Sequence, residues 1–296
     1  CANGFFVANP MLTIFALQLA VPLSLILWLA VAPASSRGAL TIQAIATALA
    51  LFAIALAGVW LFPPWWAPWL YAVLFVFATM NAWRKRRDTA WLPQNWRQWG
   101  VSIVFLVIGG YGVSEASHIF VGRTSPTRPH VDLAFPLMGS SFLVLNGGGD
   151  VRINSHQKTM HANESRLLAW RGNAYGVDLV AIDHWGMRVP GVQPADPSLY
   201  HIFGMPVLAP CSGTIATAVD GLPDMIVPQY DRANMAGNYV ILVCDYVHVV
   251  MAHFKEGSVL ARTGEIVHIG QKLAEVGNSG GTDEPHLHIH AQLPGT

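Results

Sequence analysis

Charged residues are scarce in this sequence. Lys, Arg, Asp and Glu together make up only 11% of its 296 residues, whereas hydrophobic residues make up 53%. Soluble globular proteins carry about 25% charged residues, so this composition argues against an ordinary soluble protein. The formal net charge is zero. Since binding to nucleic acid needs a basic surface, we expect no nucleic-acid partner.

The shortage of charge is confined to one part of the chain. Between Cys1 and Trp83 the one formally charged residue is Arg37, and all other charged side chains follow Trp83. This asymmetry predicts a membrane-embedded part joined to a polar part. We predict a transmembrane anchor domain over residues 1–122, a linker rich in Thr, Ser and Pro over 123–130, and a polar domain over 131–296.

Cysteine is also scarce, with three residues in the chain. Neither a CxxC motif nor a four-cysteine pattern is present, which argues against a zinc held by cysteines. Cys211 and Cys244 flank two runs, 214–219 and 239–243, that would bring the two cysteines close together if they paired as antiparallel strands. The pair could form a disulfide in an oxidising compartment or remain two buried thiols, and the sequence leaves both open.

Long apolar runs fill the first part of the chain. A helix needs roughly 20 apolar residues to cross a bilayer, so we predict about four transmembrane helices, with Pro22 kinking the first. In the last of them Gly109 and Gly110 interrupt the apolar run and Glu115 follows. That helix therefore either ends near Val113 or carries Glu115 to the far interface. The predicted spans are residues 11–32, 39–62, 69–83 and 100–121.

A basic cluster, Arg-Lys-Arg-Arg at residues 84–87, indicates the orientation of these spans. Basic residues beside a span favour the cytoplasmic side. Four crossings would then deliver everything after residue 121 to the outside, whereas three would leave it inside. We predict a multi-pass protein of the inner, cytoplasmic membrane with its polar domain on the periplasmic or extracellular side.

The polar part reads as an antiparallel all-β domain. It contains seven short runs with strand character, separated by turn residues such as Gly147–Asp150 and Gly264, and no convincing amphipathic helix. The runs are residues 142–145, 176–182, 214–219, 239–243, 246–252, 266–269 and 286–291.

The last of these runs carries three histidines, His286, His288 and His290, spaced by two. On a strand, such spacing places all three imidazoles on one face. A face of imidazoles is costly to bury without partners, and zinc is a common partner of neutral histidine. The alternative is a solvated strand face that carries histidines by chance.

Five stretches in the polar part resemble the lysostaphin/LytM-like zinc metallopeptidases, the M23 peptidases. They are Phe-Gly-Met-Pro-Val-Leu-Ala-Pro at residues 203–210, Ala-Gly-Asn-Tyr-Val-Ile at 236–241, Met-Ala-His-Phe at 251–254, Gly-Asn-Ser-Gly at 277–280 and Pro-His-Leu-His at 285–288. The resemblance covers roughly residues 131–292. It implies a small antiparallel β domain with a groove and one Zn²⁺ per chain. It also implies hydrolysis of peptide bonds, most often in peptidoglycan cross-links.

The same resemblance assigns roles to individual residues. It implies that His288 and Asp178 are zinc ligands and that His286 and His253 are the catalytic histidines. It assigns no role to His290, which we expect to be a neighbour or packing residue. His248 is five residues from His253 and should face the opposite side of the strand, so we expect it to point outward.

One position departs from the pattern of the family. The first zinc ligand is usually a histidine four residues before the aspartate, and here that position is Ala174. Some members resemble this chain in having an Asn-x-His element behind a Gly-rich turn, which favours His156 in Asn154-Ser155-His156 as the third metal ligand. His161 and, more weakly, His184 remain alternatives.

The sequence therefore predicts a membrane-anchored zinc metalloendopeptidase that cleaves peptidoglycan peptides, with loops 222–235 and 163–173 lining its groove. No HExxH motif is present, so histidines must supply the acid–base chemistry. The alternative is a non-catalytic LytM-like module that binds cell wall or activates another cell-wall hydrolase, and Ala174 is its motivation. A transport or sensing role of the spans is disfavoured because they carry almost no ionisable residues.

Overall fold

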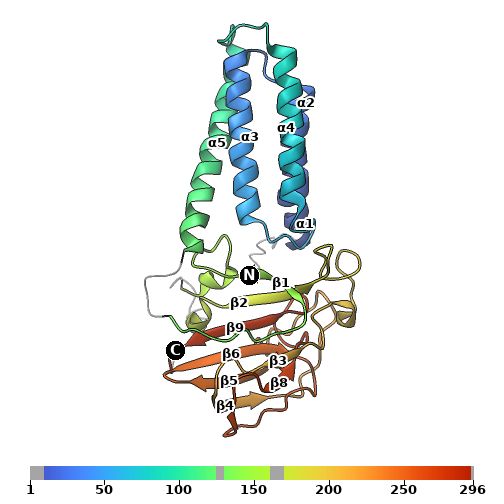
Figure 1. Ribbon diagram of the computed structural model, residues 1–296, viewed down its shortest axis with the longest axis vertical. Coiled ribbons are helices and arrows are strands. Elements are labelled where there is room, and N and C mark those ends of the chain that lie inside the picture. The colour runs from blue at the N-terminus through green and yellow to red at the C-terminus, as the bar shows by residue number, and fades with distance from the viewer. Residues whose placement is uncertain (1–9, 125–129, 161–169, 295–296) are drawn as a thin grey trace, which may run out of the picture. The chain divides into compact units, whose positions relative to one another are not determined.

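The computed structural model of the protein describes residues 10–124, 130–160 and 170–294. The chain divides into two compact units, Cys1–Val121 and Gly122–Thr296. The first is built of helices and the second mainly of strands (Figure 1). The predicted combination of apolar N-terminal helices with a C-terminal antiparallel β domain is confirmed. Most of the predicted linker, residues 125–129, lies outside the described residues.

The described residues of the helical unit form four long helical stretches. The first consists of α1 (Pro10–Phe15), the π-helical turn η1 (Ala16–Ala20) and α2 (Val21–Val31). It is followed by α3 (Arg37–Ala57), α4 (Ala67–Arg86) and α5 (Trp96–Arg123). Among the described residues, three helices are long and apolar enough to cross a membrane: Leu12–Val31, Arg37–Ala57 and Trp96–Arg123. The predicted third span falls within α4, which is not one of these three.

At Pro22, where a kink was predicted, the helix contains the π-helical turn η1 just before the proline. Proline has no N–H, so the carbonyl of Gln18, four residues earlier, lacks its helical partner. The Tyr71 hydroxyl of α4 donates to that carbonyl at 2.7 Å, and the Gln18 side chain accepts from the Trp60 backbone N–H at 2.9 Å. Contacts within the bundle therefore replace the hydrogen bond that proline removes.

Helix α5 settles the question raised by Glu115. The helix runs without interruption from Trp96 to Arg123, past both Gly109 and Glu115, so it does not end near Val113. Gly112 lies against the backbone of Leu49 and Ala50 in α3, where an added Cβ would come within about 3.1 Å of three backbone atoms. The glycines that interrupt the apolar run thus belong to the helix, and Gly112 allows close packing against α3.

The second unit is organised around a seven-stranded antiparallel sheet with the strand order β1-β2-β9-β6-β5-β4-β7. A separate two-stranded sheet pairs β3 (Pro206–Leu208) with β8 (Lys272–Glu275). Each of the seven predicted runs overlaps one strand of the large sheet, whereas β3 and β8 were not predicted. The large sheet consists of β1 (Ser141–Asn146), β2 (Val177–Ile182), β4 (Gly213–Val219), β5 (Asn238–Cys244), β6 (Val247–Phe254), β7 (Ile266–Val267) and β9 (Leu287–Gln292).

Alternation along the central strands gives the sheet two different faces. In β5 the side chains of Val240, Leu242 and Cys244 are buried in the core, together with Met251 of β6 and Leu287 of β9. Residues one position away point to the other face. The register of β2, β9, β6 and β5 aligns on that second face Asp178, His288, Ala252 and Tyr239 in one row, and His290, Val250 and Ile241 in the next.

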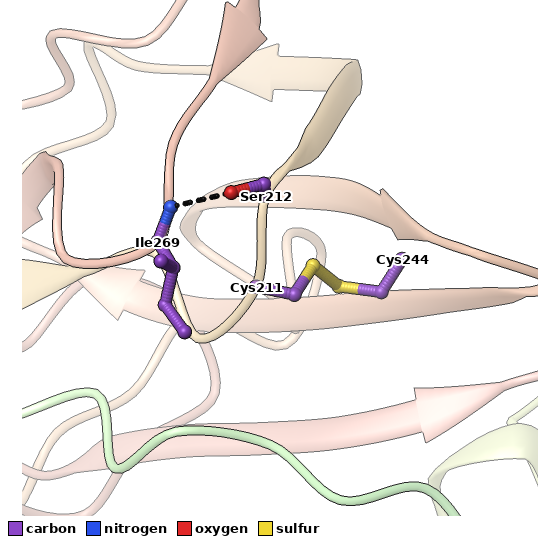
Figure 2. Close-up of a disulfide and its surroundings, with 4 residues drawn as sticks. All are labelled: Cys211, Ser212, Cys244 and Ile269. Atoms are coloured by element: carbon purple, nitrogen blue, oxygen red, sulfur yellow. Dashed lines mark hydrogen bonds between the residues drawn. A yellow bond between two sulfur atoms is a disulfide. The ribbon is translucent and has the colours of Figure 1, made fainter.

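A disulfide joins Cys211, two residues before β4, to Cys244 at the end of β5 (Figure 2). The Cα atoms of Cys211 and Cys244 are 6.0 Å apart, and the bond closes a separation of 33 residues. Next to it, the Ile269 backbone N–H donates to the Ser212 hydroxyl at 3.0 Å. Of the two states left open by the sequence, the structure therefore forms the disulfide.

Candidate metal centre

Two neighbouring strands place a carboxylate and an imidazole side by side. Asp178 of β2 lies directly opposite His288 of β9 in the register, so their side chains share one face of the sheet. The His288 Nδ1 atom lies 2.7 Å from Asp178 Oδ1, and both residues are buried. The other carboxylate oxygen, Oδ2, accepts from the Asn146 side-chain amide at 2.7 Å.

A second imidazole reaches the same carboxylate from the short 3₁₀ helix η2 (Ser155–Met160). The His156 Nε2 atom lies 3.5 Å from Asp178 Oδ2, and the His156 and His288 ring centroids are 4.8 Å apart. One ligand atom from each of His156, Asp178 and His288 lies within 4.8 Å of the others. Two nitrogens and a carboxylate are the donor types that a catalytic zinc site uses.

The orientation of His156 is fixed by Asn154. The Asn154 amide nitrogen is buried against three carbonyls and donates to those of Gly148, Ala174 and Gly176 at 2.9, 3.3 and 3.2 Å. Its oxygen must then point the other way, and it lies 3.0 Å from His156 Nδ1. An amide oxygen only accepts, so Nδ1 carries the proton and the lone pair is on Nε2, the atom that faces Asp178.

His286 lies beside this group on the turn that leads into β9. Its Nδ1 atom is 2.8 Å from the Glu284 carbonyl and 3.0 Å from the Thr282 hydroxyl, and Thr282 itself donates to the Glu284 carbonyl at 2.6 Å. Since a carbonyl only accepts, Nδ1 carries the proton. The Nε2 atom therefore carries the lone pair, and it lies 3.6 Å from Asp178 Oδ1.

His253 enters the group through a β-bulge. In the pairing of β5 with β6, Asn238 lies opposite Phe254 and Tyr239 opposite Ala252, so His253 is an extra residue. It has a φ of +65°, a left-handed conformation that costs a residue other than glycine free energy. A bulge re-aims the side chain at its position. The His253 ring lies 4.8 Å from that of His286, and its Nδ1 atom lies 3.0 Å from the Ser279 carbonyl.

This bulge corrects the expected orientation of His248. The register places His248 opposite Gln292, hence on the same face as His288. Strict alternation would have put His253 on the core face, and the bulge reverses this. The expectation that His253 and His248 face opposite sides by strand parity is therefore wrong, because parity does not hold across an inserted residue.

Burial and mutual contact shift the pKa values of these groups. Burial raises the pKa of Asp178, but His286, His288 and His156 together lower it by more, so the carboxyl is strongly biased to its ionised form. Burial lowers the pKa of His156, and burial and the neighbouring His286 and His288 hold the pKa of His253 well below its usual value. An ionised carboxylate beside a neutral His156 imidazole suits metal binding, because metal ligands must be deprotonated.

A groove lies on the same face of the sheet. It has a volume of about 460 Å³, and its lining includes Tyr239, Ile241 and Val250 from the sheet. One side is formed by residues of the predicted loop 222–235, including Leu222, Asn234 and Met235, and Trp170 and Asn173 of the other predicted loop also line it. Residues 163–169 of that loop lie outside the described residues.

The alternative third ligands do not join the group. His161 lies outside the described residues, and His184 packs against Trp185, with ring centroids 4.9 Å apart. Four residues that orient the group were not predicted: Asn146, Thr282, Glu284 and Ser279, the last through its carbonyl. The sequence carries little signal for them, because two act through backbone carbonyls and any residue type could supply those.

Comparison with solved structures finds several peptidases. The catalytic domain of the antimicrobial peptidase lysostaphin from Staphylococcus simulans is 22% identical, with 41% of this chain and 68% of that chain covered and a TM-score of 0.28. The catalytic domain of the prophage-encoded M23 protein EnpA from Enterococcus faecalis is 19% identical, with 55% and 88% covered and a TM-score of 0.31. A zinc containing peptidase from Vibrio cholerae is 16% identical, with 40% and 46% covered and a TM-score of 0.25.

A family model gives the stronger comparison. Residues 200–296 match Peptidase family M23, and comparison with curated proteins gave no match. The matched residues include His253, His286 and His288, whereas His156 and Asp178 precede them. The family match, rather than the low TM-scores, identifies the fold of this unit. Residues 200–296 are thus identified as an M23 peptidase domain.

Proposed function

We propose that this protein is a membrane-anchored zinc metalloendopeptidase that hydrolyses peptide bonds in peptidoglycan cross-links. The observation that carries the proposal is the convergence of His156, Asp178 and His288, with His286 and His253 beside them. The family match favours peptide-bond hydrolysis, and the resemblance to lysostaphin/LytM-like peptidases favours peptidoglycan as the substrate class.

The donor set fits one zinc ion. Zinc is commonly held by three protein ligands in catalytic sites, which leaves one position open. Here the ligands would be His156 through Nε2, Asp178 through its carboxylate and His288 through Nδ1, the atoms that face one another. When bound, zinc would polarise the scissile carbonyl and lower the pKa of a water molecule toward about 7.

The two remaining histidines would move protons. Both use Nδ1 for a backbone carbonyl, Glu284 for His286 and Ser279 for His253, so Nε2 is the nitrogen available for chemistry. His286 would take a proton from the attacking water and deliver it to the leaving amine. His253 would donate a hydrogen bond to the developing oxyanion after it takes up a proton, or share the acid–base role. The low pKa of His253 keeps its imidazole neutral at neutral pH.

The cellular location is part of the proposal. Three helices long and apolar enough to cross a membrane support membrane attachment. The Cys211–Cys244 disulfide supports an oxidising compartment for the second unit, because disulfides persist outside the cytoplasm. By the orientation rule three crossings would leave the domain inside, so we take α4, which ends in basic residues, as a fourth crossing. With four crossings the peptidase domain lies on the periplasmic or extracellular side of the inner, cytoplasmic membrane.

The second candidate is a non-catalytic module that binds cell wall or activates another hydrolase. Ala174, where the family usually has a ligand histidine, is the observation that favours it. The position of His156 against Asp178 weakens that argument, since it supplies an imidazole at the group by another route. A purified chain that binds peptidoglycan without turnover and holds far less than one zinc would establish this second candidate.

The deciding experiment is digestion of purified peptidoglycan by the full chain in detergent micelles. Mass spectrometry of the products identifies the bond cut, and the same sample is assayed for zinc. We expect cleavage by the wild type and a loss of about 10²–10⁴-fold in rate for His286→Ala, the range that a general acid–base group contributes. His268→Ala is the matched control and should retain full activity, because His268 is exposed and follows β7, the edge strand that β6, β5 and β4 separate from β9.

A further inference from the structure

His290 and Gln292 continue the row of polar side chains that begins with His288. The three residues are spaced by two along β9 and share one face of the sheet. The His288 Nε2 atom lies 2.8 Å from His290 Nδ1, and His290 Nε2 lies 3.0 Å from Gln292 Oε1. Together with the 2.7 Å contact between Asp178 and His288 Nδ1, these distances form a continuous chain of four side chains.

Hydrogen-bond chemistry gives the chain a direction. The Gln292 amide oxygen only accepts, so His290 Nε2 carries the proton and His290 Nδ1 carries the lone pair. His290 Nδ1 then accepts from His288 Nε2, which must be protonated. The Asp178 carboxylate, which only accepts, likewise favours a proton on His288 Nδ1, and a bound metal ion would take the place of that proton. His288 would then keep the Nε2 proton, donate it to His290 and offer the Nδ1 lone pair to the metal. This is the tautomer in which His288 Nδ1 can bind a metal.

The two proposed ligand histidines, His156 and His288, are thus oriented in the same way: a side chain holds the nitrogen that faces away from the metal position. His156 has its distal nitrogen held by Asn154, which is buried behind it. His288 has its distal nitrogen held by His290, which lies on the groove side and is itself held by Gln292. In metalloenzymes the partner of the distal nitrogen of a ligand histidine fixes its ring and tautomer.

We propose that His290 is a positioning residue for the metal ligand His288: it accepts the Nε2 proton of His288 and thereby keeps Nδ1 directed at the metal. This inference rests on the proposed zinc site. It departs from the expectation that His290 is a neighbour or packing residue, and it gives Gln292 the further task of fixing the tautomer of His290. Neither residue touches the metal in this arrangement.

The test is the zinc affinity of the full chain in detergent micelles, measured by competition with a chromophoric chelator. His290→Phe keeps the ring but removes the acceptor, and we expect zinc affinity to fall about 10–100-fold, the range for such partner residues. In His290→Asn the amide oxygen stands near the position of Nδ1 and can accept the same proton. We expect it to restore affinity to within about threefold of the wild type.

Two further measurements separate positioning from other roles. The absorption spectrum of the cobalt(II)-substituted chain should change in His290→Phe and return in His290→Asn, which a purely structural or substrate-binding role would not produce. His268→Phe is the matched control and should leave affinity and spectrum unchanged. If His290→Phe binds zinc as tightly as the wild type, or loses only substrate affinity, the inference is overturned. A wild-type chain that binds no zinc overturns the proposed function as well.

Discussion

Large apolar side chains face outward in the helical unit and inward in the β unit. In the helical unit large apolar residues face outward: Leu27, Ile45 and Val107 are 62%, 56% and 66% exposed. In the β unit the corresponding residues fill the core, where Leu242, Met251 and Leu287 are fully buried. An outward apolar surface of this extent is suited to lipid, whereas an inward one is suited to water.

The two units also differ in what their buried polar groups do. In the helical unit Gln18 and Gln43 are buried and their side-chain oxygens accept from backbone N–H groups, those of Trp60 and Ala34. In the β unit, buried Asp178 and His288 face each other and further imidazoles. A buried amide that accepts from a backbone N–H group serves to stabilise the fold. Buried groups that can lose or gain a proton, gathered around one point, are typical of a ligand site.

The sharpest test of this difference is Asp178→Asn. The substitution keeps the shape of the side chain but removes the negative charge, so zinc affinity should fall by more than the roughly 100-fold seen for outer partner residues. The measurement is zinc content after dialysis against a metal buffer. The helical unit should be unaffected, as judged by helical circular dichroism.

Asp183→Asn is the matched control for that variant. Asp183 lies in an exposed turn and accepts from the Trp185 and Met187 backbone N–H groups at 2.9 and 2.8 Å, which an asparagine oxygen can also do. It should bind zinc as the wild type does. Equal zinc binding by Asp178→Asn and the wild type would show that the cluster is not a metal site.

The next largest effect is expected at a buried ion pair of the β unit. The fully buried Arg188 donates to both carboxylate oxygens of Glu284, at 2.6 and 2.7 Å, and the Glu284 carbonyl holds His286. Arg188→Met leaves the Glu284 carboxylate buried without its partner, which typically costs about 3–5 kcal/mol. The thermal midpoint of the β unit should fall by about 10 °C, measured by near-ultraviolet circular dichroism.

A substitution of an exposed arginine is the control for that prediction. Arg262→Met changes the same chemical group at an exposed site and should cost less than about 0.5 kcal/mol. Catalysis offers a second readout, because loss of the Glu284 contact should also lower the rate through His286. A stable Arg188→Met protein with wild-type activity would mean that the ion pair neither holds the fold nor orients His286.

A somewhat smaller effect is expected for the disulfide. Cross-linking residues 33 apart removes entropy from the unfolded chain equivalent to about 3–4 kcal/mol. The double variant Cys211→Ser, Cys244→Ser should lose stability of that order in the β unit only. Thermal unfolding with and without reductant measures it: reductant should destabilise the wild type and leave the variant unchanged. A wild type insensitive to reductant under unfolding conditions would indicate that the disulfide does not form.

Runs of strand-forming residues predicted the strands of the large sheet, including the two-residue β7. They did not predict β3 and β8, because β3 begins with proline and β8 is Lys-Leu-Ala-Glu, residue types with weak strand preference. The helices were predicted from apolar length alone. The doubtful span in the sequence was residues 100–121, because of its glycines and Glu115, yet these lie within the long apolar helix α5. α4 is not among the three candidate spans, and the Arg84, Lys85 and Arg86 at its end lower its mean hydropathy.

Within the site, the strand residues were the most accessible to prediction. Asp178 and His288 follow from a resemblance and from spacing on strands, and the structure places them opposite each other. His253 required a bulge that no spacing rule contains. His290 was expected to be a neighbour or packing residue, and the role proposed for it depends on a hydrogen bond to His288. Alternation does not predict that bond, because it shows only that the two residues share a face.

The smallest effects come from one substitution made in both units. Ile45 lies near the middle of α3 (Arg37–Ala57) and Ile266 lies in β7, and both are well exposed, at 56% and 71%. In water, Ile→Lys at an exposed position changes stability by less than about 0.5 kcal/mol. At the centre of a membrane-crossing helix, lysine costs about 3 kcal/mol on insertion. Ile45→Lys should therefore reduce the membrane-inserted fraction in a glycosylation-reporter assay, while Ile266→Lys should alter neither insertion nor the thermal midpoint. Equal tolerance at both positions would mean that α3 faces protein or water at Ile45 and not lipid, and the contrast between the two units would then lose its explanation.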